Sequence, residues 1–262
     1  MRGLQLAPGG GSVIVFSHPN HELAIFGLVQ RLRPRLIYLT DGGGSGRIDE
    51  TRQGLANLGL ADNADFLAYT EASLYDALLD GNLTLYREVA DRVRQRIDAL
   101  DARQVFCDAV EFYNPLHDMS LPIVRAALGG RAATPIFEVP LVYQTVGPGE
   151  GYEVQRMPPS RRAGQVEVPL TERELAAKLS ARDGGYALLQ QQMGPVLSML
   201  SEEHLSTEVV APASPRLPTP GTDCVLRYEW RGQTLLERGE VARRITYTEH
   251  YLPIATALCA PS

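Results

Sequence analysis

The stretch Val13-Ile14-Val15-Phe16-Ser17-His18-Pro19-Asn20-His21-Glu22 decides the fold of this 262-residue chain. Its first four residues are apolar, which is typical of a strand that is buried on both faces of a parallel sheet. We therefore expect the polar residues that follow to lie at the carboxyl end of that strand. Open α/β sheets build their binding sites at this edge. His18 and His21 are thus candidate site residues.

Strands and helices are expected to alternate through the first half of the chain. Apolar runs predict strands at 13–16, 35–40, 64–69, 104–109 and 135–139. The spacing of apolar residues predicts helices at 23–32, 51–60, 85–100 and 121–128. This alternation indicates an α/β protein, with a three-layer Rossmann-like domain and a mostly parallel sheet. The crossover between the first two strands should be right-handed.

The pattern loosens beyond residue 147 and resumes with a helix that begins at Thr171-Glu172-Arg173-Glu174, a capping-box signature. The segment 211–220 contains four prolines and is predicted to be a linker or a surface strap. We expect residues 1–210 to form the α/β domain and residues 211–262 to be a linker and a small C-terminal appendage packed on the same domain. The appendage could be a lid or a dimer element, and the second alternative implies a homo-oligomer.

Composition and charge argue against several classes of partner. A formal charge of −6 and a pI near 5.4 argue against binding to nucleic acid or to an anionic membrane surface, because these partners usually bind a clustered basic face. The arginine pair Arg243-Arg244 is expected to be solvated. The sequence has no apolar run of 18 residues and no signal segment, and its three cysteines are widely spaced, which favours reduced thiols. We therefore expect a cytoplasmic protein that acts on a small-molecule substrate.

A third histidine, His117, follows the strand predicted at 104–109. Together with His18 and His21 it offers three neutral nitrogen donors, the number that a catalytic zinc needs while one coordination position stays open. We expect these three residues to bind a divalent metal that activates a water molecule. Zinc is the first choice for such a site, and iron is the alternative because three histidines also suit it.

The sequence resembles the PIG-L/LmbE-like family of zinc-dependent de-N-acetylases. His18-Pro19-Asn20-His21-Glu22 is similar to that family's His-Pro-Asp-Asp-Glu signature, and Asn114-Pro115-Leu116-His117 stands where the family usually has His-Pro-Asp-His. Leu39-Thr40-Asp41-Gly42, followed by Arg47 and Glu50, has the order and spacing of the family's next block. The resemblance spans roughly residues 12 to 200. It implies a hydrolase that removes an acyl group from an N-acyl amino sugar or a similar small metabolite, with Arg47 as a substrate anchor.

The departures from the family pattern affect proton transfer. The resemblance implies that Asn20 and His21 replace the family's general base and one zinc-ligating Asp, and that Asn114 replaces a histidine that assists the leaving group. The Asn20 amide can orient water but cannot accept a proton, whereas Asn114 can donate to an oxyanion. Losing a general base or acid typically costs about a hundredfold to ten-thousandfold in rate. Carboxylates in the same loops are the candidate replacements: Glu22, Asp41, Glu111 and Asp118.

Two further interpretations remain beside the hydrolase. The three-histidine centre could serve a metalloenzyme of a different reaction type, with iron as an alternative metal, or the chain could be a non-catalytic ligand-binding relative. Tyr113 lies beside a predicted strand end and could offer a hydroxyl group to the substrate. We therefore count it with Arg47 as a candidate substrate-binding residue.

Overall fold

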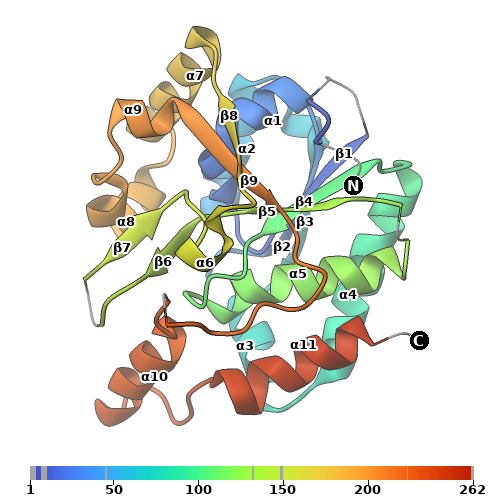
Figure 1. Cartoon of the computed structure of the whole chain (residues 1–262), viewed down its shortest axis with the longest axis vertical. Coiled ribbons are helices and arrows are strands. Elements are labelled where there is room, and N and C mark those ends of the chain that lie inside the picture. Colours follow the sequence, from blue (N-terminus) through green and yellow to red (C-terminus); the bar gives the residue numbers. More distant parts are fainter. Residues whose placement is uncertain are drawn as a thin grey trace.

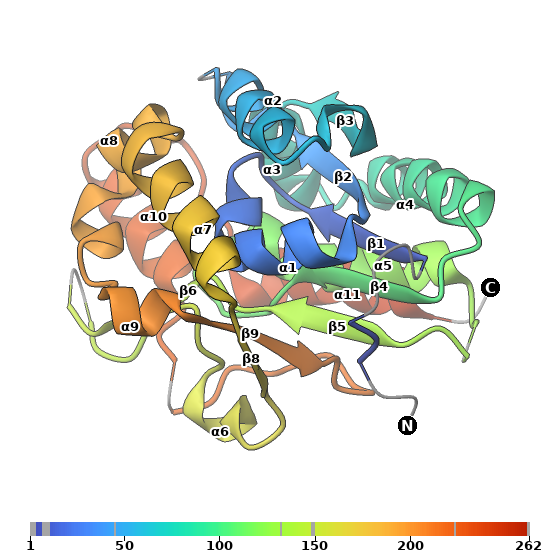
Figure 2. The same ribbon diagram turned by 90° about the horizontal axis from the view of Figure 1, so that it is seen from above.

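A seven-stranded sheet forms the centre of the fold, and helices cover both of its faces (Figures 1 and 2). The computed structural model describes residues 4–6, 11–44, 46–131, 133–147, 150–222 and 224–260. The strand order is β3-β2-β1-β4-β5-β9-β8. The first five strands in this order are parallel, and β9 and β8 are antiparallel additions at one edge. The strands of this sheet are β1 (Ser12–Phe16), β2 (Arg35–Thr40), β3 (Ala64–Tyr69), β4 (Gln104–Asp108), β5 (Ile136–Val139), β8 (Val166–Pro169) and β9 (Thr207–Pro212).

The strand order reverses at β1, because the chain runs outward from it to β2 and β3 and then returns to β4 on its other side. Doubly wound sheets form their ligand crevice outside the carboxyl ends of the strands at such a switch point. The loops that follow β1 and β4 therefore meet at this crevice. These are the two loops that carry His18, His21 and His117.

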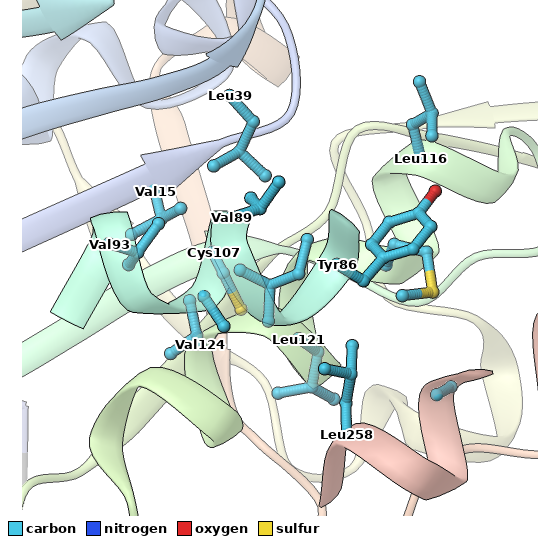
Figure 3. Packing of buried hydrophobic residues seen from close by; sticks show 14 of the residues in the cluster. Val15, Leu39, Tyr86, Val89, Val93, Cys107, Leu116, Leu121, Val124 and Leu258 are labelled. Atoms are coloured by element: carbon cyan, nitrogen blue, oxygen red, sulfur yellow. The ribbon is translucent and has the colours of Figure 1, made fainter. Parts of the chain in front are cut away.

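Alternate residues of β1 face two separate parts of the core. Val13 and Val15 pack with one cluster, whereas Ile14 and Phe16 pack with the other on the opposite face. All four side chains are buried, as a two-sided parallel strand requires. On the first face, Val15 lies with Val89 of α4 (Leu83–Ala99), and residues of α5 (Pro115–Leu128) and α11 (Leu252–Cys259) complete the packing (Figure 3).

The remaining elements surround this frame. On the second face lie the 3-10 helix η1 (His21–Ile25), α1 (Phe26–Leu32), α2 (Arg47–Asn57), α7 (Glu172–Gly184) and α8 (Ala187–Leu197), while α3 (Glu71–Leu79) lies beside α4. A two-stranded sheet is formed by β6 (Val142–Gln144) and β7 (Tyr152–Val154). The other helices are η2 (Ala61–Asn63), α6 (Pro159–Arg162), α9 (Glu202–Leu205), α10 (Arg227–Glu237) and the π-helix η3 (Tyr247–Tyr251). None of the helices within the described ranges is long and apolar enough to span a bilayer.

The α/β class and the mostly parallel sheet are confirmed, and the five predicted parallel strands lie where the apolar runs placed them. Helix starts differ from the prediction because caps, not apolar spacing, decide them. The helix predicted from 121 begins at Pro115, since the Asn114 side chain accepts a hydrogen bond from the Leu116 amide at 2.9 Å. The helix predicted from 51 begins at Arg47, after Gly46 turns the chain with a φ of +76°.

The prediction that the proline-rich segment 211–220 is a linker or surface strap is partly wrong, because its first two residues, Ala211 and Pro212, belong to β9. Strand β9 pairs with β5 through Phe137 and Glu138, and its partner on the other side is β8. The proline lies at the last position of the strand, where a missing amide donor is tolerated. The boundary predicted from the proline content, between residues 210 and 211, therefore falls inside the last strand.

A buried ion pair holds the histidine loop to the rest of the fold. The Lys178 ammonium donates to Glu208 at 2.9 Å and to the Ala24 carbonyl oxygen at 2.9 Å. The Glu208 carboxylate in turn accepts the backbone amides of Gly27 and Leu28, at 2.8 Å and 2.7 Å, at the start of α1. An anion at a helix N-terminus is favourable, and the ammonium balances its charge away from water. This contact fixes the turn that follows His21.

Candidate metal centre

Three histidine side chains converge at the switch point of the sheet. His18 and His21 follow β1, and His117 lies in the first turn of α5, which follows β4. One ligand atom from each ring lies within 4.8 Å of the others, and the ring centroids are 4.6 to 5.1 Å apart. His18 and His117 are buried, and His21 is slightly exposed. The structure thus brings together the three histidines that the sequence analysis predicted to be metal ligands.

The nitrogen atoms of this cluster fit a metal ion. His117 Nδ1 is buried and has no hydrogen-bond partner among the described residues, and His18 Nε2 makes no aligned hydrogen bond, although Glu71 Oε1 lies 2.9 Å from it. An unpaired buried polar atom costs about 1 to 3 kcal/mol, a cost that a bound cation would remove. Burial lowers the pKa of His21 and lowers the pKa of His117 well below its ordinary value. These shifts favour neutral His21 and His117 rings, the state that coordinates a metal.

Asp108 orients His21 from behind. Its Oδ1 lies 3.0 Å from His21 Nδ1, and its Oδ2 accepts the Ser17 amide at 2.7 Å and the Ser120 hydroxyl at 3.1 Å. Burial opposes ionisation of this carboxyl, but the His21 ring and the Ser17 amide hold its pKa below the ordinary value. An anionic Asp108 keeps a proton on Nδ1 and turns Nε2 toward the centre. Sequence reasoning missed this residue, although its place at the end of β4 was a usable signal.

Glu71 is the second residue that sequence reasoning missed. It begins α3, after the end of β3, and its Oε1 lies 2.9 Å from His18 Nε2 without the alignment of a hydrogen bond. Its side chain is 24% exposed, so its carboxylate borders the cavity described below. Burial would raise its pKa, yet the contact with His18 and the charge of Arg47 keep the pKa lowered. A carboxylate therefore faces the three-histidine cluster.

Asn20 and Asn114 both border the centre, and each amide already has partners. Asn20 lies in the left-handed region with a φ of +79°; its Nδ2 donates to Glu50 at 2.8 Å and its Oδ1 accepts from Thr51 at 3.1 Å. Asn114 Oδ1 accepts the Leu116 amide and, at 3.3 Å, the hydroxyl of Tyr75. Asn20 is thus bonded to α2, whereas Asn114 retains an amide group that can donate.

Arg47 and Tyr113, the two predicted substrate-binding residues, also lie at the centre. Arg47 is buried, and its Nη2 donates to the Pro19 carbonyl oxygen at 2.6 Å, which holds the histidine loop in place. Burial lowers the pKa of Arg47, while the charge of Glu71 opposes that shift. The Tyr113 ring stacks at 6.3 Å from the His117 ring, and burial raises the pKa of its hydroxyl.

Two predicted carboxylates lie outside the cavity. Glu22 is fully buried, which raises its pKa, and its carboxylate accepts hydrogen bonds from the Tyr38 and Tyr186 hydroxyls at 3.0 Å and 2.8 Å, which oppose that shift. Asp41 Oδ1 accepts the amides of Gly43 and Glu71 at 3.0 Å and 3.4 Å. Both side chains hold the loops that carry the site, and the cavity wall contains neither of them.

Glu111 and Asp118 are also buried behind the site. The Glu111 carboxylate accepts the amides of Leu141 and Val142, and Asp118 accepts those of Glu111 and Phe112. Burial raises the pKa of Asp118 to about 7 and raises the pKa of Glu111 well above its ordinary value. Their hydrogen bonds shape the loop between β4 and α5. Of the carboxylates considered, Glu71 is the one that borders the cavity.

A cavity of about 230 Å³ opens beside the histidine cluster. One wall is polar and consists of the histidines with Asn20, Arg47, Glu71 and Asn114. The opposite wall is apolar and includes side chains from η1, from the β6–β7 region and from α8: Leu23, Leu141, Val154, Leu189, Met193 and Val196. Such a combination of apolar surface with a few converging polar groups is typical of a small-molecule site.

Comparison with known proteins supports the fold. No protein-family profile and no curated protein sequence matches the chain. The solved A40926 pseudoaglycone deacetylase Dbv21 is similar over 80% of this chain and 99% of its own, with a TM-score of 0.57 and 12% identity. A deacetylase in complex with bog from the teicoplanin biosynthesis pathway (13% identity, TM-score 0.56) covers 77% of this chain and 96% of its own. The zinc-inhibited form of teicoplanin deacetylase Orf2 (12% identity, TM-score 0.54) covers 77% of this chain and 97% of its own. The chain therefore has the fold of solved deacetylases.

Proposed function

We propose that the chain is an atypical metal-dependent hydrolase of the PIG-L/LmbE-like type, which removes the acyl group from an N-acyl amino sugar or a similar small metabolite. The observation that carries this proposal is the cluster of His18, His21 and His117, which includes the unpartnered His117 Nδ1 and borders a cavity with an apolar wall. The deacetylase fold supports it. A divalent metal bound by the three histidines, zinc in the first instance, would polarise the acyl carbonyl and acidify a water molecule.

Residues of the chain supply the general base, the oxyanion donor and the substrate anchor. The Glu71 carboxylate would replace the missing base at position 20: its Oε1, which faces the histidine cluster, would accept the proton of the attacking water, and the positive charge of Arg47 favours the ionised carboxylate. Asn114 donates its amide to the developing oxyanion, and the apolar wall beside α8 holds the acyl group. Arg47 anchors the substrate from the polar wall.

The test is release of free amine from a panel of N-acetylated amino sugars and amides. We expect turnover that a chelator removes and that one metal restores. Glu71→Gln should keep its metal and lose about a hundredfold to ten-thousandfold in kcat, the usual contribution of a general base. Glu240→Gln is the matched control, since that glutamate is 54% exposed and lies on the chain beyond α10.

The alternative outcomes are separable. Loss of metal in Glu71→Gln would make this residue a ligand and refute its role as the base. Consumption of a panel compound that depends on ferrous iron and releases no amine would favour a metalloenzyme of a different reaction type. Tight ligand binding with no turnover under any metal would favour a binding protein.

A further inference from the structure

A second cavity, of about 610 Å³, adjoins the first one. It lies between α3 and α10, and Tyr113 and Asn114 border both cavities. The Tyr113 ring contacts a residue of each cavity, because its centroid lies 6.3 Å from that of the His117 ring and 4.0 Å from Cζ of Arg227. Tyr113 and Asn114 therefore form the boundary at which the two cavities meet.

The second cavity is strongly basic. Four arginines border it: Arg227 and Arg231 of α10, and Arg243 and Arg244 of the loop that follows α10. They come together although the chain carries a net charge of −6. The sequence analysis predicted that Arg243-Arg244 is a solvated pair; Arg243 is exposed, and both residues border the cavity.

Most of this positive charge has no protein counter-ion. Arg243 pairs with Asp80 at 2.7 Å, but no carboxylate among the described residues lies within ion-pair distance of Arg227, Arg231 or Arg244. The one acidic side chain in the cavity wall, Asp76, is exposed. Arg227 and Arg231 are one helical turn apart, a spacing at which like charges repel. A bound anion would remove this repulsion.

The orientation of Arg227 suits such an anion. Its Nε is buried and has no hydrogen-bond partner within the described part of the chain, while the Tyr113 ring fixes the guanidinium plane. A fixed guanidinium binds phosphate or carboxylate with two parallel hydrogen bonds. The arginine therefore presents an ordered donor group at the point where the cavities meet.

We propose that the second cavity is an anion subsite, which binds a phosphate or carboxylate group of the same substrate whose N-acyl group lies at the histidine cluster. This inference rests on the proposed function for the position of the acyl group. It defines the substrate class more narrowly: an N-acylated amino compound that carries an anionic group on the side remote from the acyl group. Arg227 and Arg231 bind the anion, and Arg244 adds to the positive field.

The experiment compares ligands that differ in charge. N-acetylglucosamine, its 6-phosphate and N-acetylglucosaminuronic acid, which carries a carboxylate at C6, are titrated calorimetrically into the zinc-loaded protein. We expect at least one anionic sugar to bind about tenfold more tightly than the neutral sugar, and the stronger of the two identifies the anion. Arg231→Gln should reduce this preference to about twofold or less. Arg231 is exposed, so the variant is expected to fold, and thermal melting checks this.

Arg238→Gln is the matched control, because this arginine lies at the end of the same helix, is 66% exposed and does not border the cavity. It should keep the preference. Equal affinity for neutral and anionic sugars, or a preference that survives Arg231→Gln, would overturn the subsite. If no sugar binds, inorganic phosphate is titrated instead, and the subsite requires saturable binding that Arg231→Gln abolishes.

These readouts separate the two proposals because binding needs no turnover. Amine release without a charge preference would refute the anion subsite and leave the hydrolase intact. A charge preference that depends on Arg231, without amine release under any metal, would refute the hydrolase and leave the subsite.

Discussion

Replacing Asp108 with asparagine should weaken metal binding through His21 without touching a ligand. The carboxylate makes three contacts at once, with His21 Nδ1, the Ser17 amide and the Ser120 hydroxyl. An asparagine whose Oδ1 keeps the Ser17 and Ser120 contacts must turn its Nδ2 toward His21. A donor then faces the Nδ1 proton, so the ring is driven to the tautomer with its proton on Nε2, the atom that should coordinate the metal.

The size of this effect follows from the position of Asp108 behind one of three ligands. Losing such an orienting partner typically costs about tenfold to a hundredfold in metal affinity, which is about 1.4 to 2.7 kcal/mol. We expect Asp108→Asn to fall near the upper end, because it reverses the hydrogen-bond sense as well as removing the charge. The assay is a competition titration of zinc against a chromogenic chelator at neutral pH.

Ser120→Ala is the matched control for this measurement. It removes one of the hydrogen bonds to Asp108 Oδ2 but leaves the contact with His21 in place. We expect its zinc affinity to stay within about fivefold of wild type, since the lost hydrogen bond acts on the metal only through Asp108 and should change the binding free energy by no more than about 1 kcal/mol. Equal zinc affinity in wild type and a folded Asp108→Asn would refute the orienting role of Asp108.

Two further predictions concern stability. Lys178→Met should lower the free energy of unfolding by about 3 to 5 kcal/mol in urea denaturation, because Glu208 is left buried without its cation; a loss below about 1 kcal/mol would contradict this. The second concerns Glu174, whose pKa is lowered to about 2 by its hydrogen bonds with Arg31, against the effect of burial. Because the folded pKa lies below the ordinary value of 4.5, this pair stabilises the protein above pH 4.5 and loses its effect as the pH falls toward 2. The shift corresponds to about 3 kcal/mol at most, and solvent screening reduces it to about 1 to 2 kcal/mol. The stability gap between wild type and Glu174→Gln should therefore shrink by more than half between pH 7 and pH 3, and a constant gap would contradict the assignment.

The sequence was sufficient to predict the positions of the parallel strands and the approach of the three histidines to one another. Apolar runs such as 13–16 mark strands that are buried on both faces, and a parallel sheet places their carboxyl ends at one edge, so His18 and His117 had to approach each other. Local pattern reasoning works here because each histidine lies within a few residues of a strand end.

The remaining site residues depend on contacts between distant segments. Glu71 reaches the centre because α3 begins directly after β3. That helix was not predicted, although Leu74, Ala77 and Leu78 have helical spacing. Asn20 was predicted to border the attacking water, yet its amide is bonded to Glu50 and Thr51 of α2, a pairing that needs the folded loop to be recognised. The arginine cavity arises in the same way, since its members come from two segments that are brought together only by packing.

The most direct test of the metal centre is the zinc content of the purified, zinc-reconstituted protein measured by elemental analysis. Wild type should hold about one equivalent per chain, and His18→Ala and His117→Ala should each hold far less, because each removes one of three ligands. His204→Ala, whose ring bonds to the Val154 carbonyl oxygen away from the cluster, should match wild type. Equal zinc content in all four proteins, whether negligible or near one equivalent, would contradict a metal centre formed by His18, His21 and His117.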